Sequence, residues 1–314
     1  MGTLKIKMFG SLQVGREEAC GPREEGCASR HQSVPRPCGR SAQALLAYLV
    51  LHRNRMHRRE ALAGLLWGEA SEERARGALR TALWRLRRVV EPPGVPTGRR
   101  LVTTRQGEVG FEVGGDVWVD AMVFENVVAA ALASRPEELG DDHAAQLEAA
   151  LRLYEGELLE GFYDDWVLRE RERLRALYLQ ALTCLMHGAA ARGDLDVAIG
   201  RGRQLLLQDP LRESLHREVM RLYLRNGQRA QALRQFVECR RVLDEELQVE
   251  PMPETLALQR EISRGPLPGP RPGLVAEEAR PGRLQDAMAS LRRALVELRH
   301  VQGELDDATG GLPP

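Results

Sequence analysis

Residues 71–91, SEERARGALRTALWRLRRVVE, constrain the fold more than any other stretch of the chain. At about 100° per residue on a helix, the large apolar side chains fall in one narrow stripe, which predicts a side that faces a core. These side chains are Leu79, Leu83, Leu86 and Val90. Ser71 stands where an N-cap is expected, and the two glutamates after it suit the positive end of a helix dipole. A long amphipathic helix is therefore predicted.

The other sides of this helix are cationic. Arg76, Arg80 and Arg87 form a second stripe with Trp84 beside them, and more arginines spread round the surface. Guanidinium groups can fork onto phosphate or onto the guanine edge in the major groove. Arginine-rich helix faces are also often plain solvated surface, and only Lys5 and Lys7 of the 45 basic residues are lysines. The helix alone leaves both interpretations open.

The distribution of charge favours a polyanion partner for one half of the chain. Net charge is zero overall, but residues 40–106 carry 14 arginines against five acidic residues, which gives +9. Residues 107–263 carry 18 arginines against 29 acidic residues, which gives −11. Because phosphate binding is electrostatic before it is sequence-specific, only the first segment is expected to meet nucleic acid.

Length and composition set further limits. A chain of 314 residues can hold two domains and a tail. It shows no N-terminal signal peptide and no apolar run long enough to span a membrane, so a cytoplasmic protein with no membrane association is expected.

The five cysteines are odd in number, and a cytoplasmic chain keeps thiols reduced, so no structural disulfide is expected. Cys184 and Cys239 fall on apolar faces of predicted helices and are expected in the core. Another set of four residues lacks the close pair of ligands typical of zinc sites, so no metal and no cofactor are predicted. This set is Cys20, Cys27, His31 and Cys38. The role of its cysteines stays open.

The order of elements in the first third indicates a winged helix-turn-helix. Residues 3–14 alternate as two short strands joined at a turn, and residues 15–40 have no periodicity and are predicted to be an inserted loop. Ser41 is expected to cap a helix that ends near His52, and a second helix follows over residues 58–66. After the long basic helix, residues 101–104 and 109–113 form a predicted hairpin tipped by Arg105 and Gln106. In this fold the last helix enters the major groove and the hairpin touches the backbone or minor groove.

Three runs carry a family resemblance: RREALAGLLWGE (58–69), ALRTALWRLRRVVE (78–91) and VWVDAMVFE (117–125). They resemble the DNA-binding half of the Streptomyces antibiotic regulatory protein family, which is similar to the OmpR-type effector domain. The family commonly ends this helix in a Ser-Arg-Leu-Arg-Arg stretch, and Trp84 stands here in place of the small residue. The resemblance implies homodimers on repeated half-sites about one helical turn apart.

The resemblance also implies RNA polymerase as a partner, met by the turn before the basic helix. The residues of this turn are Trp67, Gly68, Glu69, Ser71, Glu72 and Glu73. Its acidic side chains suit a protein partner better than DNA.

From Asp120 onward the pattern is helical. Residues 157–210 look like the bacterial transcriptional activator domain of the same family, mainly at Gly161-Phe162 and Asp165-Trp166. Independently, Gly193 and Gly227 stand 34 residues apart, as do Ala198 and Ala232, and this is the tetratricopeptide period. The aromatic residues at helical spacing are expected to pack between helices. They are Tyr154, Phe162, Tyr163, Trp166, Tyr178, Tyr223 and Phe236.

The predicted fold is mainly α with a small β part. Residues 1–116 form a winged helix-turn-helix domain, and residues 117–263 form a tetratricopeptide-like activator domain. Residues 264–283 are a Pro/Gly linker, and residues 284–307 form a C-terminal amphipathic helix with a heptad pattern. That helix either dimerises as a coiled coil or docks on its own chain, and the pattern does not decide between them.

The favoured function is a sequence-specific transcriptional activator that binds double-stranded promoter DNA and recruits RNA polymerase. From the basic helix the predicted DNA contacts are Arg74, Arg76, Arg80, Thr81, Trp84, Arg85, Arg87 and Arg88. From the wing they are Arg99, Arg100, Arg105 and Gln106.

The alternative is a helical-repeat scaffold or ligand sensor whose basic N-terminal domain binds protein rather than DNA. Stacked helix pairs leave a concave surface that usually binds protein, so a peptide or small-molecule effector would lie within residues 143–262. An enzyme is disfavoured, because the sequence has no P-loop, no His-Glu-x-x-His, no Gly-x-Ser-x-Gly and no dinucleotide fingerprint. The activating signal and the target genes are not visible in the sequence.

Overall fold

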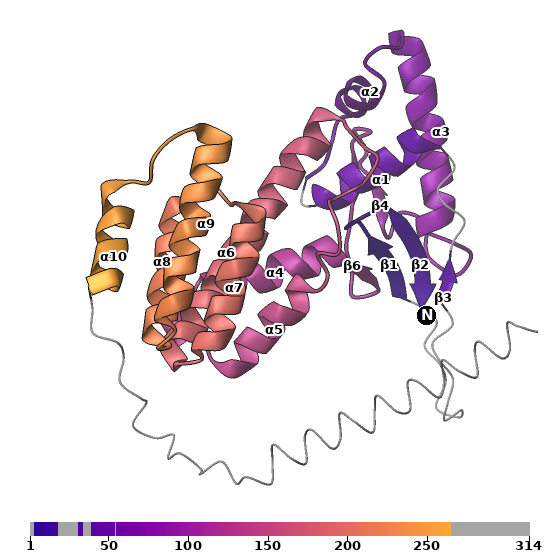
Figure 1. Cartoon of the computed structure of the whole chain (residues 1–314). Coiled ribbons are helices and arrows are strands. Elements are labelled where there is room, and N and C mark those ends of the chain that lie inside the picture. Colours follow the sequence, from indigo (N-terminus) through magenta and orange to yellow (C-terminus); the bar gives the residue numbers. More distant parts are fainter. Residues whose placement is uncertain (1–2, 18–30, 34–38, 54, 265–314) are drawn as a thin grey trace, which may run out of the picture. The chain divides into compact units, whose positions relative to one another are not determined.

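The computed structural model describes residues 3–17, 31–33, 39–53 and 55–264 (Figure 1). The described residues up to Ser263 form one compact unit. The predicted linker beyond Arg264, the predicted helix 284–307 and the cysteines at 20, 27 and 38 lie outside the described residues.

A four-stranded sheet lies at the N-terminus, and its strands follow the spatial order β3-β2-β1-β6. The strands are β1 Thr3–Lys7, β2 Gln13–Glu17, β3 His31–Ser33 and β6 Val117–Val119. β1 runs antiparallel to β2 and parallel to β6. The two predicted strands are confirmed. The loop predicted over residues 15–40 is wrong at residues 15–17 and 31–33, where main-chain pairing makes strands from segments without apolar alternation.

The predicted order of three helices and a hairpin is confirmed. The helices are α1 Arg40–Leu51, α2 Arg59–Trp67 and α3 Glu72–Val90, and the hairpin consists of β4 Leu101–Thr103 and β5 Val109–Phe111. Ser41 does not cap α1, because the helix already starts at Arg40 and its N-cap is Gly39, with φ of 93°. That left-handed φ suits glycine, which has no Cβ.

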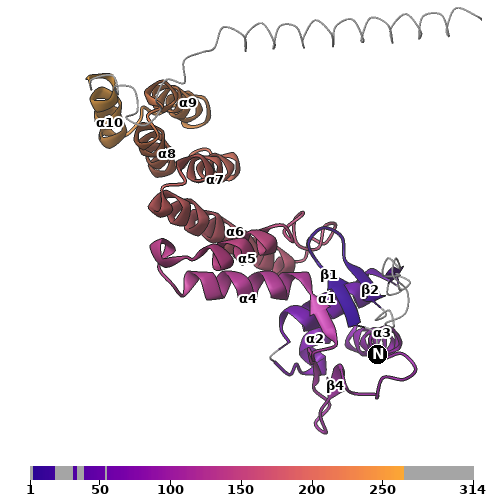
Figure 2. The same cartoon turned by 90° about the horizontal axis from the view of Figure 1, so that it is seen from below.

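The rest of the described chain is helical. Its elements are α4 Asp120–Leu132, the 3-10 turn η1 Pro136–Glu138, α5 Asp141–Leu151, α6 Asp165–Arg192, α7 Leu195–Gln208, α8 Glu213–Arg225, α9 Arg229–Leu247 and α10 Pro253–Arg264. Gly193 and Gly227, with φ of 88° and 73°, make the turns of the α6/α7 and α8/α9 hairpins. The 34-residue period therefore marks real repeats, and Figure 2 shows these helices in succession. No helix in the described part of the chain is long and apolar enough to cross a membrane.

One hydrophobic core joins the N-terminal sheet to the first helices after it. The ring of Phe9, just past β1, lies edge-on to Phe124 of α4 with ring centroids 5.5 Å apart, and Tyr154 packs against both. A second core lies among α6 to α10. The first core continues across residue 117, the predicted domain boundary, because β6 belongs to the N-terminal sheet.

Most of the aromatic residues pack as predicted, as do the two cysteines at 184 and 239. Tyr163 is the exception. Tyr163 is 71% exposed, and the guanidinium of Arg171 lies over its ring, 5.7 Å from the centroid. The prediction of a core position was wrong because Tyr163 lies in the loop before α6, where helical spacing has no meaning.

A loop of the second half is fastened to the end of β1. Leu159 N–H donates to the carbonyl of Met8 at 2.8 Å, and Gly10 exchanges main-chain bonds with Glu157 and Glu160 at the same distance. The guanidinium of Arg171 holds this loop by donating to the carbonyls of three of its residues. These are Leu158, Leu159 and Phe162, at 2.6 to 2.9 Å. The two halves are thus tied by main-chain pairing as well as by apolar packing.

Candidate nucleic-acid interface

Helix α3 buries one side and exposes the other, as its sequence predicts. Leu79, Leu83, Leu86 and Val90 are buried. The exposed residues among the predicted contacts are Arg74, Arg76, Arg80, Thr81, Trp84, Arg85 and Arg88. We refer to these seven residues as the α3 face.

The guanidinium groups of the α3 face are mostly not neutralised by carboxylates. Arg76 pairs with Glu72 at 2.5 Å, one turn earlier on the same helix, and both side chains are exposed. Within the described part of the chain, no carboxylate forms an ion pair with Arg74, Arg80 or Arg88. An exposed cluster of unneutralised cations is the electrostatic footprint expected of a polyanion site.

Three further contacts place side chains of the α3 face. The Thr81 hydroxyl donates to the Gly77 carbonyl at 3.1 Å, so it is turned back onto the helix. Arg85 reaches toward the start of α1, and its Nη1 is 3.9 Å from where a Cβ would stand at Gly39. The guanidinium of Arg88 lies over the indole of Trp84, 4.9 Å from the ring centroid.

The wing exposes some of its predicted contacts and buries another. Arg105 and Gln106 are exposed at the hairpin tip, and Arg99 is exposed with a guanidinium nitrogen 3.6 Å from Asp116. Arg100 is only 2% exposed, so its predicted contact with the DNA backbone is wrong. Its side chain donates to the carbonyl of Val90 at 2.5 Å and to the carboxylate of Asp116 at 2.7 Å. Both arginines lie in the bend before β4, and the path of the chain there turns only Arg100 inward.

The carboxylate of Asp116 remains ionised beside these arginines. Burial opposes ionisation, but the hydrogen bond and positive charge of Arg100, helped by Arg99, outweigh it and lower the pKa of Asp116. The Arg100–Asp116 pair is therefore a structural ion pair at the base of the wing.

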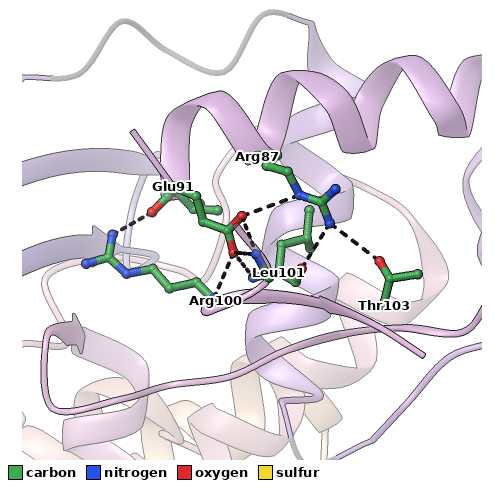
Figure 3. Close-up of polar contacts among 7 residues, drawn as sticks. Arg87, Glu91, Arg100, Leu101 and Thr103 are labelled. Atoms are coloured by element: carbon green, nitrogen blue, oxygen red, sulfur yellow. Dashed lines mark hydrogen bonds and ion pairs between the residues drawn. The ribbon is translucent and has the colours of Figure 1, made fainter. Parts of the chain in front are cut away.

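The buried carboxylate of Glu91 connects the end of α3 to the start of the wing (Figure 3). It accepts the backbone N–H groups of Gly98, Arg100 and Leu101 at 3.0, 2.8 and 2.9 Å. Glu91 lies outside the set of site residues predicted from the sequence. The available signal was an acid at the end of an arginine-rich helix, just before a Pro-Pro-Gly turn.

Arg87 belongs to the same cluster. Its guanidinium donates to the carbonyl of Leu101 at 3.1 Å, lies 3.5 Å from the hydroxyl of Thr103, and pairs with Glu91 at 3.4 Å (Figure 3). Arg87 was predicted to contact DNA with the rest of the helix. In the structure it holds the first strand of the wing against α3.

The segment between α1 and α2 braces the wing from the other side. His57 exchanges two main-chain hydrogen bonds with Val109 of β5, both at 2.8 Å, and Arg59 donates to the carbonyl of Gly107 at 2.8 Å. A Cβ at Gly110 would lie 2.5 Å from Sδ of Met56 and 3.2 Å from the carbonyl oxygen of Arg55, so the two segments approach closely at this glycine. The wing is thus held on one side by the end of α3 and on the other by the chain between α1 and α2 with the first residue of α2.

The predicted polymerase-contacting turn lies between α2 and α3. Trp67 is half-buried at the end of α2, and the rest of the predicted set is exposed. The exposed residues are Gly68, Glu69, Ser71, Glu72 and Glu73. The structure thus presents an acidic surface directly beside the start of the α3 face.

Two adjoining hollows lie between α7 and α9 in the helical repeats. Their volumes are about 570 and 510 Å³, and both are lined by Arg203, Gln235 and Glu238. Their lining is mostly polar or charged side chains. A peptide or a polar small molecule would fit this chemistry.

Comparison with known proteins supplies relatives for both halves of the chain. Residues 119–263 match the family described as the bacterial transcriptional activator domain. The chain is 31% identical over 277 residues to the regulatory protein AfsR of Streptomyces coelicolor, covering 85% of this chain and 27% of AfsR. It is 29% identical over 264 residues to the transcriptional regulatory protein MoaR1 of Mycobacterium tuberculosis, covering 84% and 83% of the two chains.

A solved structure shows the same fold. Mycobacterium tuberculosis EmbR, in complex with a low-affinity phosphopeptide, matches with a TM-score of 0.65 at 24% sequence identity. The match covers 84% of this chain and 66% of EmbR. The chain therefore spans only about a quarter of AfsR and two thirds of EmbR, but most of MoaR1.

Proposed function

We propose that this chain, a bacterial transcriptional regulator of the Streptomyces antibiotic regulatory protein type, activates promoters by binding their DNA. Helix α3 enters the major groove, and the wing lies against the neighbouring backbone. The chain then recruits RNA polymerase to the same promoter.

The observation that carries this proposal is the state of the α3 face. Its arginines are exposed, and none of the carboxylates of the acidic helical repeats pairs with Arg74, Arg80 or Arg88 in the described chain. Internal neutralisation would have removed the attraction to phosphate. The wing beside this face is held rigidly, so helix and hairpin can meet one duplex together.

The DNA contacts proposed here are a subset of those expected from the sequence. Arg87 and Arg100 are left out because their guanidinium groups hold the wing. The remaining contacts are Arg74, Arg76, Arg80, Thr81, Trp84, Arg85, Arg88, Arg99, Arg105 and Gln106.

The exposed acidic turn from Gly68 to Glu73 supports a protein partner beside the DNA. RNA polymerase is the partner proposed for it. We also propose that two copies of the chain occupy repeated half-sites about one helical turn apart. Replacing Glu69, Glu72 and Glu73 by alanine should then reduce transcription in vitro while leaving promoter binding intact.

A salt titration of DNA binding tests the main proposal. Binding of the full chain to a promoter fragment selected from genomic DNA is followed by fluorescence anisotropy at several salt concentrations. Replacing a phosphate-contacting arginine, such as Arg80→Ala, should lower the slope of log K against log salt by about 1. Arg240→Ala is the matched control, since Arg240 is exposed on α9, outside the α3 face. Normal binding by both Arg80→Ala and Arg88→Ala would show that α3 is not the DNA-binding helix.

The hollows between α7 and α9 favour a second function, that of a ligand sensor or scaffold. In that case the basic domain binds protein. The affinity of the chain for duplex DNA, measured with nucleotides as competitors, then does not fall steeply as salt concentration rises. A peptide or small molecule would instead raise the melting temperature of the chain. Arg203→Ala, which alters the shared lining of both hollows, should abolish that rise.

A further inference from the structure

Trp84 is an exposed apolar side chain surrounded by exposed arginines. Its side chain is 59% exposed, and it is the only exposed large apolar residue on α3. One helical turn away on either side stand Arg80 and Arg88, so charged groups flank the indole along the helix. Solvated cations alone would not need an aromatic surface at this position.

The position of the indole is defined by its neighbours. Arg88 stacks on it at 4.9 Å, and a guanidinium stacked in this way keeps its edge N–H donors available for hydrogen bonds. Arg87, three residues after Trp84 on the same helix, is bonded to the carbonyl of Leu101 and paired with Glu91. The helix backbone that carries Trp84 is therefore held against the wing.

The chemistry of the major groove limits what an indole can meet there. Phosphates and the guanine edge offer acceptors, which suit arginines, whereas the ring carbons of Trp84 can form only apolar contacts. Among base edges in the major groove, the C5 methyl of thymine is the apolar group. In the stacked pair, the indole of Trp84 thus offers an apolar surface for a methyl group, and the guanidinium of Arg88 offers N–H donors for an acceptor.

We propose that Trp84 is a specificity-determining residue that contacts the C5 methyl of a thymine, while Arg88 hydrogen-bonds a neighbouring base edge or phosphate. The inference rests on the proposed function and extends it to a base preference. Each half-site then contains one thymine whose methyl group, and not only its hydrogen-bonding edge, is required for tight binding.

Removal of single methyl groups from the operator tests this inference. An operator is selected from random duplexes with the full chain, and each thymine is then replaced in turn by deoxyuridine. At one thymine per half-site, loss of the methyl should weaken binding of the unmodified chain by about two- to fourfold, the effect of one buried methyl group. In Trp84→Ala this discrimination should vanish, and in Trp84→Phe part of it should return, since phenylalanine can also contact the methyl.

Two measurements separate this role from a merely structural one. Trp84→Ala should leave both the melting temperature and the salt slope unchanged, because the indole is exposed and contacts no phosphate. Tyr163→Ala is the matched control, an exposed aromatic outside the α3 face, and it should keep the full discrimination.

Failure of the Trp84–thymine contact and failure of DNA binding itself would give different results. Equal binding of thymine and deoxyuridine operators, or undiminished discrimination in Trp84→Ala, would overturn the inference while salt-dependent duplex binding keeps the proposed function. A chain that binds no duplex would overturn both.

Discussion

Oε1 of Glu91 lies 2.8 Å from the main-chain nitrogen of Arg100, so one buried carboxylate sets where the wing begins relative to α3. The same side chain accepts two more backbone N–H groups, from Gly98 and Leu101. Without this carboxylate, the backbone N–H groups of Gly98, Arg100 and Leu101 would lose their acceptor. The proposed DNA contact by helix and wing together would therefore depend on Glu91, which is itself buried.

Glu91→Ala should lower the free energy of unfolding by about 3 kcal/mol, because buried N–H groups would lose their acceptor. Glu91→Gln should recover part of this loss, since its single carbonyl oxygen can still accept. Urea denaturation measures both. Glu112→Ala, an exposed acid beside the wing, is the control and should stay within about 0.5 kcal/mol of the unmodified chain. Equal stability of Glu91→Ala and the control would contradict the anchoring role.

Two arginines of the wing should respond in opposite ways to the same substitution. Arg100→Ala should destabilise the fold by about 3 kcal/mol, because it leaves Asp116 without its closest cation in a mostly buried place. Arg105→Ala should leave stability unchanged and weaken DNA binding, since Arg105 is exposed at the hairpin tip. Denaturation and anisotropy on both variants check the pair. Loss of DNA affinity in Arg100→Ala without loss of stability would show that this arginine contacts DNA after all.

The contrast between these arginines shows what sequence reasoning can and cannot reach. The apolar stripe of α3 is periodic, so the helix, its buried side and its cationic face could be predicted. Arg99 and Arg100 are adjacent and identical, and only the path of the chain after Glu91 decides which is buried. Likewise β3 is made by main-chain pairing with β2, which leaves no side-chain pattern to find. The exposed Tyr163 was misplaced because a loop interrupts the helical spacing.

Asp120 should make stability depend on pH in an unusual direction. Its carboxylate accepts N–H groups from Met8 and Phe9, yet burial outweighs these bonds and raises the pKa of Asp120 above its ordinary value. The folded state then holds its proton more tightly than the unfolded state, so stability from this group is present at low pH and falls as pH rises through the folded pKa. The free energy of unfolding of the unmodified chain, relative to that of Asp120→Asn, should fall as pH rises through the folded pKa of Asp120. A difference that grows with pH would contradict the raised pKa.

Residues 1–116 should not fold independently, although they contain every predicted DNA contact. The fragment lacks β6, which pairs with β1 through Leu4, Lys5 and Ile6, and it lacks Asp120 and Phe124. Residues 1–263 keep all of these partners, so they should unfold in one cooperative transition with a shared core. Circular dichroism melting and limited proteolysis of the two fragments provide the measurement. A sharp transition in 1–116 at the temperature of 1–263 would show that the N-terminal segment is stable without its neighbour, and that the pairing of β1 with β6 is dispensable.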